Sequence, residues 1–176
     1  MLLILDLDET LIFATENKLY TPEDFICGEY FVYKRPHLDD FLDSIKKYYD
    51  IAVWTSSTRA YAEMIVDNIF PQSYPLTFLW ARDRCTRRLD VDYHKYYNLK
   101  NLKKVKKKGY SLNEILIVDD TPGKVSLNYG NHIRVEPFEG DLNDKDLLKL
   151  EKYLFSIKDI LNVRVVEKRG WKNKVK

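Results

Sequence analysis

The chain has 176 residues, with 29 Lys and Arg against 27 Asp and Glu, so its formal net charge is only +2. This length favours one domain with a sizeable core, and the near-neutral charge neither requires nor excludes a nucleic-acid partner. No apolar stretch reaches membrane-spanning length, and Cys27 and Cys85 lack the spacing of a metal site. We therefore expect reduced thiols in an intracellular, cytoplasmic protein that makes no contact with membranes.

The first apolar run, residues 2–5, leads directly into Asp6, Asp8 and Thr10. A short run that is apolar on both faces predicts a buried strand of a parallel sheet. The carboxylates then lie at the end of that strand, where open α/β sheets bind ligands. Because buried carboxylates need a counter-charge and offer only oxygen ligands, the pattern favours a Mg²⁺ site. The alternative is a strand that ends in a polar turn, with an Asp capping a helix.

Strand formers follow at residues 29–34, and apolar residues at helical spacing follow at 38–45. Pro36 fits the first turn of that helix. The segment between Thr10 and Tyr30 is too short for a large cap domain. We expect it to form a flap or hairpin over the site.

A second apolar run, residues 50–54, ends in Thr55, Ser56 and Ser57, and a helical pattern follows over 58–70. Hydroxyls and backbone N–H groups at a strand-to-helix turn can hold a phosphate. The alternative is simple N-capping by Ser57 or Thr58. Arg59 is either a substrate contact or an exposed helix arginine.

Residues 71–98 look irregular, with short strands expected on both sides of the Arg-rich segment 82–84. The aromatic residues of this segment include Tyr93, Tyr96 and Tyr97. They either line a substrate groove or are partly buried amphipathic rings. His94 has no visible partner and is expected at the surface. The basic run 103–108 is expected to be a solvated helix face rather than a nucleic-acid patch.

A third apolar run, residues 114–118, ends in Asp119 and Asp120, and Pro122 can begin the next helix. Three runs thus deliver carboxylates or hydroxyls to one edge of the predicted sheet. A short strand at 132–135 and a helix opening at 141–144 follow. We expect a basic C-terminal tail over 161–176, whose end, residues 167–176, is mobile. The alternation of strands and helices predicts a doubly wound parallel sheet.

Four separated motifs carry a resemblance to a known family. Asp6-Leu7-Asp8-Glu9-Thr10 resembles the first signature of the haloacid dehalogenase superfamily, in the form found in its Fcp/Scp-type C-terminal-domain phosphatases, the NLI-interacting-factor-like group. Residues 55–62 are similar to the second signature of that group. Lys100-Asn101-Leu102 resembles its lysine motif, and residues 119–122 resemble its acidic signature. The resemblance spans most of residues 1–160.

The resemblance implies a Rossmann-like α/β domain over residues 1–160, with helices on both faces, no large cap and a small β insertion at 71–98. It implies Asp6 as the nucleophile and Asp8 as general acid and base. Thr55 and Lys100 would hold the phosphoryl oxygens. The resemblance also implies that Mg²⁺ binds to Asp6, Asp8, Asp119 and Asp120. The substrate contacts that it implies are Thr10, Ser56 and Arg59.

The function so implied is a magnesium-dependent phosphomonoester hydrolase that forms an aspartyl-phosphate. Its expected substrate is phosphoserine or phosphothreonine in a protein or peptide, because a site without a large cap is open to a peptide. Two alternatives stand beside it. One is a catalytically idle binding module, and the other is a phosphatase of small molecules or nucleic acids.

Overall fold

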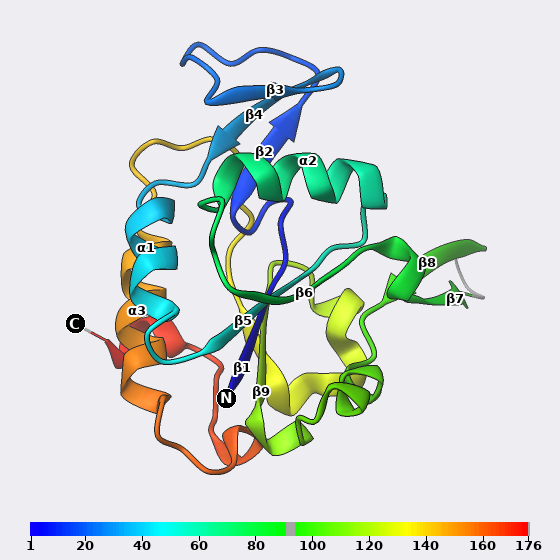
Figure 1. The fold of residues 1–176 in the computed structure, drawn as a ribbon, viewed down its shortest axis with the longest axis vertical. Coiled ribbons are helices and arrows are strands. Elements are labelled where there is room, and N and C mark those ends of the chain that lie inside the picture. Colours follow the sequence, from blue (N-terminus) through cyan, green and yellow to red (C-terminus); the bar gives the residue numbers. More distant parts are fainter. Residues whose placement is uncertain (91–93, 176) are drawn as a thin grey trace.

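Five parallel strands form the central sheet: β1 Leu2–Leu5, β5 Asp50–Trp54, β6 Leu76–Trp80, β9 Ile115–Asp119 and β10 His132–Arg134. The computed structural model describes residues 1–90 and 94–175. The strand order is β10-β9-β1-β5-β6, with β1 in the middle (Figure 1). Leu2 lies opposite both Asp50 and Ile115. The predicted parallel α/β fold is confirmed.

Helices cover both faces of this sheet, as its apolar strands require. The α-helices are α1 Leu38–Ile45, α2 Arg59–Ile69 and α3 Asp146–Ile157. They pack on the face that carries Leu3 and Leu5. The opposite face, with Leu2 and Ile4, is covered by the 3-10 helices η2 Leu102–Lys108 and η4 Pro122–Asn131. Short 3-10 turns complete the described chain: η1 Arg82–Arg84, η3 Leu112–Glu114, η5 Val163–Val165 and η6 Trp171–Lys174.

The expected flap over the site is a three-stranded antiparallel sheet of β2 Ile12–Thr15, β3 Phe25–Cys27 and β4 Tyr30–Lys34. β4 lies in the middle and pairs with both neighbours. Figure 1 shows this sheet beyond α2, at one end of the molecule. The absence of a large cap is also confirmed over the described residues.

The insertion is smaller than predicted. β6 pairs in parallel with β5 and belongs to the central sheet, so only the antiparallel hairpin of β7 Thr86–Asp90 and β8 Lys95–Leu99 projects from it (Figure 1). Tyr93 lies outside the described residues. Tyr96 and Tyr97 are exposed, and the Arg87 guanidinium lies 3.9 Å from the Tyr96 ring centroid. His94 is exposed, as expected.

The prediction of a mobile tail is wrong for the part of the tail that the structure describes. Trp171 is only 3% exposed, and its Nε1 donates a hydrogen bond of 2.6 Å to the carbonyl of Arg134. The buried Lys168 ammonium donates to three backbone carbonyls. Segment 163–171 therefore packs against β10 and α3. Within the described residues, no helix has the length and apolarity needed to cross a membrane.

Candidate active site

The carboxyl ends of β1, β5 and β9 bring the predicted residues together. Asp6 follows β1, and its backbone N–H donates to the carbonyl of Val118 on β9 at 3.0 Å. Asp119 ends β9, and Thr55 follows β5. All three side chains are buried. Parallel pairing therefore assembles residues that lie more than one hundred positions apart.

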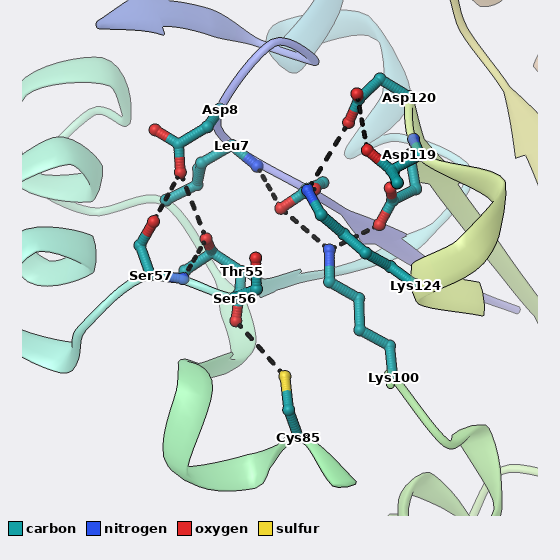
Figure 2. A network of polar contacts seen from close by, with 12 residues as sticks. Leu7, Asp8, Thr55, Ser56, Ser57, Cys85, Lys100, Asp119, Asp120 and Lys124 are labelled. Atoms are coloured by element: carbon teal, nitrogen blue, oxygen red, sulfur yellow. Dashed lines mark hydrogen bonds and ion pairs between the residues drawn. The ribbon is translucent and has the colours of Figure 1, made fainter. Parts of the chain in front are cut away.

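Lys100 joins two of these carboxylates. Its Nζ lies 2.9 Å from Asp6 Oδ1 and 2.6 Å from Asp119 Oδ2, and its side chain is 0% exposed (Figure 2). Burial lowers the pKa of Lys100, but attraction from Asp119 and Asp6 outweighs burial and raises it overall. The lysine is therefore held as an ammonium. Its backbone is fixed by hydrogen bonds to Lys124 and from Asn128.

The pKa values of Asp6 and Asp119 shift in opposite directions although both carboxylates contact Lys100. Burial alone raises the pKa of Asp6, but attraction from Lys100 and Lys124 outweighs it and holds that pKa below its ordinary value. Burial raises the pKa of Asp119 to about 7, against the attraction of Lys100. These directions favour Asp6 as the carboxylate of the pair that keeps its charge more readily.

A divalent cation fits the group of carboxylates formed by Asp6, Asp119 and Asp120. One oxygen from each lies within 4.8 Å of the others. Asp120 Oδ1 is buried and has no hydrogen-bond partner among the described residues. Because the donors are all oxygens and one of them is unsatisfied, the set suits Mg²⁺.

Asp8 turns its carboxylate away from this group. Tyr61 donates to Asp8 Oδ1 at 2.6 Å, and Ser57 donates to Oδ2 at 2.8 Å. Thr55 Oγ1 lies 3.4 Å from the same Oδ2. Figure 2 shows Asp8 beside Ser57, across the site from Asp119. These hydroxyls hold the Asp8 carboxylate at the entrance to the site.

The three predicted substrate contacts lie in different surroundings. Thr10 is buried, and its carbonyl accepts a hydrogen bond from Arg35. Ser56 borders the open cavity described below. Arg59 is 47% exposed on its side chain and pairs with Glu63 and Asp83, so its interactions fit the simpler interpretation of an exposed helix arginine.

Sequence reasoning missed Lys124, Ser57 and Tyr61 as site residues. Lys124 Nζ lies 3.3 Å from Asp6 Oδ2 and 3.8 Å from Asp120 Oδ1. Its position four residues after Asp120 was the available signal. Ser57 and Thr58 were the two candidates for the cap of α2, and the cap is Thr58, whose hydroxyl accepts from Tyr61 N–H.

A cavity of about 430 Å³ opens beside these residues, between the flap and α2. Tyr30 and Ala14 line it from the flap, and Tyr61 lines it from the helix. Asp8 and Lys124 form the part nearest the carboxylates. The remaining lining residues are Glu9, Ser56, Ser57, Thr58 and Arg82. The cavity therefore meets the site at Asp8 and Lys124, and its lining contains both acidic and basic side chains.

Comparison with known proteins agrees with this geometry. Residues 1–164 match the family described as NLI interacting factor-like phosphatase. Nuclear envelope morphology protein 1 of Saccharomyces cerevisiae is 31% identical over 180 residues, which cover 92% of this chain and 40% of the yeast protein. The CTD nuclear envelope phosphatase 1 homolog of Drosophila melanogaster is 33% identical over 183 residues, which cover 96% of this chain and 72% of the fly protein.

A solved structure shares the fold. The fission yeast RNA polymerase II CTD phosphatase Fcp1, bound to beryllium fluoride, matches with a TM-score of 0.60 and 20% sequence identity. The match covers 93% of this chain and 52% of the Fcp1 chain. The resemblance inferred from the four motifs is confirmed.

These names also correct one expectation. The relatives from yeast, fly and frog are named for the nuclear envelope, which contradicts the expected cytoplasmic location. That expectation rested on hydropathy and cysteine spacing. Neither property reports which compartment or surface a folded domain is attached to.

Proposed function

Because the chain belongs to the NLI interacting factor-like phosphatase family, we propose that it is a magnesium-dependent phosphomonoesterase acting through an aspartyl-phosphate on Asp6. The observation that carries the proposal is the buried Asp6–Lys100 pair at 2.9 Å, beside an open cavity. A carboxylate kept ionised next to a fixed ammonium is a nucleophile with a cation ready for phosphoryl oxygens.

The two oxygens of Asp6 have different tasks in this proposal. Oδ1 accepts from Leu7 N–H at 2.9 Å and faces Lys100, so it is held in place. Oδ2 faces Lys124, which borders the cavity. Oδ2 is therefore the atom that attacks phosphorus, while the bond from phosphorus to the ester oxygen breaks.

Asp8 supplies the proton movements. It gives a proton to the departing alkoxide in the first step, and it accepts one from the water that attacks the aspartyl-phosphate in the second. Its contacts with Ser57 and Tyr61 aim the carboxylate at the cavity. The products are inorganic phosphate, the alcohol and free Asp6.

Asp6, Asp119 and Asp120, with the Asp8 carbonyl, would hold Mg²⁺. When bound, the metal offsets the repulsion between phosphate and carboxylates and stabilises the transferring group. Lys100 would add its charge beside Asp6 Oδ1, and Thr55 offers a hydroxyl near Asp8. The protein thus surrounds a phosphoryl group with cations and donors.

The proposed substrate is a phosphoserine or phosphothreonine side chain in a protein. The cavity is open, bordered by a small flap, and lined by Tyr30, Tyr61 and Arg82, which suits an extended peptide. Relatives named CTD nuclear envelope phosphatase support a phosphoprotein substrate. The chain spans only 40% of the yeast relative, so the activity of any whole protein is part of this proposal.

Hydrolysis of p-nitrophenyl phosphate, with Mg²⁺ and with EDTA, tests the proposal. We expect activity that depends on Mg²⁺, is lost in Asp6→Asn and is kept in Asp67→Asn, a control on the exposed face of α2. A folded, inactive wild-type protein would favour the idle binding module. Activity that survives Asp6→Asn would exclude the assigned nucleophile.

Substrate class is tested next by competition. A phosphoserine peptide and a 3′-phosphorylated oligonucleotide are each added to the p-nitrophenyl phosphate assay, with the unphosphorylated forms as controls. We expect the phosphopeptide to compete and to release phosphate. Preference for the oligonucleotide would instead favour a nucleic-acid phosphatase.

A further inference from the structure

Lys124 lies between two carboxylates of the group that fits a metal ion. Its Nζ is 3.3 Å from Asp6 Oδ2 and 3.8 Å from Asp120 Oδ1 (Figure 2). The Asp120 oxygen has no hydrogen-bond partner among the described residues. The ammonium thus lies between two of the residues that would hold a divalent cation, without satisfying Asp120 completely.

The two lysines of the site are held very differently. Lys100 is 0% exposed and makes contacts of 2.9 and 2.6 Å. Lys124 has a side chain that is 22% exposed, makes longer contacts and borders the cavity. Lys100 is therefore a fixed cation, whereas Lys124 has room to turn from the carboxylates toward the cavity.

The charges of the site lead to the same conclusion. Three carboxylates face two ammonium groups, which leaves one negative charge when all are ionised. A divalent cation added to this group would repel the Lys124 ammonium at short range. If Lys124 turns away, the two remaining negative charges match one divalent cation.

We propose that Lys124 is a displaceable cation: it holds Asp6 and Asp120 in the metal-free protein, yields that place to a divalent metal, and then binds a phosphoryl oxygen in the adjoining cavity. The inference rests on the proposed function, since it assumes a metal and a phosphate at this site. It adds a second phosphate-binding lysine to Lys100. It also couples the two binding events, because the turn of Lys124 that frees the carboxylates for a metal brings its ammonium to the phosphate.

Two binding measurements that need no turnover test the proposal. Mn²⁺ is titrated into the phosphate-free protein and followed by electron paramagnetic resonance. Inorganic phosphate is then titrated into the Mg²⁺-loaded protein by calorimetry. The variants are Lys124→Met and Lys124→Gln, and the control is Lys103→Met, which removes the same charge from the exposed face of η2.

We expect both Lys124 variants to bind Mn²⁺ about tenfold more tightly than wild type, because the competing ammonium is gone. We expect them to bind phosphate about tenfold more weakly, while Lys103→Met changes neither affinity. Circular dichroism establishes that each variant is folded. Agreement between Lys124→Met and Lys124→Gln shows that the effect comes from loss of the lysine and not from the residue that replaces it.

Unchanged Mn²⁺ affinity in both variants would overturn the displacement, and unchanged phosphate affinity would overturn the second phosphate contact. Either result leaves the proposed function standing. A wild-type protein that binds no Mn²⁺ would overturn the proposed function and this inference together. If Lys103→Met changes the Mn²⁺ and phosphate affinities as much as the Lys124 variants do, the cause is the overall charge of the protein and the proposal is wrong.

Discussion

Arg35 donates to both carboxylate oxygens of Asp144, from Nε to Oδ1 at 3.0 Å and from Nη2 to Oδ2 at 2.8 Å. The Arg35 side chain is fully buried and also donates to the carbonyls of Thr10 and Glu136. One guanidinium therefore ties the loop after Asp6 and Asp8 to the segment that precedes α3. This bidentate geometry is one that lysine cannot reproduce.

Removing this guanidinium should destabilise the protein. We expect Arg35→Met to lower the free energy of unfolding by about 3 kcal/mol, because Asp144 loses its buried partner and two carbonyls lose a donor. Urea unfolding followed by circular dichroism measures the loss. Arg59→Met, at an exposed ion pair, should change stability by less than about 0.5 kcal/mol. Equal losses in the two variants would contradict the role given to Arg35.

The same pair predicts a dependence of stability on pH. Burial raises the pKa of Asp144, but hydrogen bonds from Arg35 and from Asp146 N–H outweigh it and hold that pKa below its ordinary value. Between the two pKa values, the unfolded chain binds more protons at this position than the folded chain does. The contribution is therefore complete above about pH 5 and is lost as the pH falls through the folded-state pKa.

Urea midpoints of wild type and Asp144→Asn, taken from pH 6 down to pH 3, measure this contribution. We expect the difference in urea midpoint between wild type and Asp144→Asn to be constant from pH 6 to about pH 5 and to narrow below about pH 4. Asp67→Asn, at an exposed position, serves as the control and should follow wild type throughout. A difference in urea midpoint that widens at low pH would contradict the stabilising role of the ionised Asp144 carboxylate.

Tyr61 is expected to position Asp8. Its hydroxyl donates to Asp8 Oδ1 at 2.6 Å, and burial and the Asp8 charge raise the pKa of Tyr61, so it stays a donor. Tyr61→Phe removes one hydrogen bond to a charged group and should lower kcat about tenfold with little change in KM. Steady-state kinetics on p-nitrophenyl phosphate check this expectation.

Tyr110→Phe provides the matched control for that variant. Tyr110 donates to Asp50 Oδ2 at 2.9 Å, at the opposite end of β5 from Thr55. It is also a tyrosine–aspartate pair, and its loss should leave kcat unchanged. A rise in KM alone for Tyr61→Phe would instead make Tyr61 a substrate contact.

The sheet and the position of its acidic edge were predictable because they depend on local patterns. Residues 2–5, 51–54 and 115–118 are apolar on both faces, and a covered parallel sheet buries such strands. Parallel strands then bring their carboxyl ends to one edge. Asp6, Thr55 and Asp119 lie together for that reason.

The features that were missed depend on contacts between distant segments. β6 follows Pro71 and Pro75 and precedes an Arg-rich turn, so its sequence suggested an irregular insertion. Its pairing with β5 is visible only in the three-dimensional structure. The tail is basic and polar, yet Trp171 finds the carbonyl of Arg134. Lys124 is one of many lysines, and its reach to Asp6 depends on how η4 is placed.

Lys100 is expected to be indispensable for activity. It is the fully buried cation that faces Asp6 and Asp119, at 2.9 and 2.6 Å. Lys100→Met leaves two buried carboxylates to repel each other, so Asp6 takes up a proton more readily and phosphoryl oxygens lose a donor. We expect kcat/KM to fall at least about 100-fold. Lys104→Met, whose ammonium contacts only the carbonyls of residues 84 and 85 among the described residues, should keep full activity. A folded Lys100→Met protein with near-normal kcat/KM would show that Asp6 does not need this ammonium.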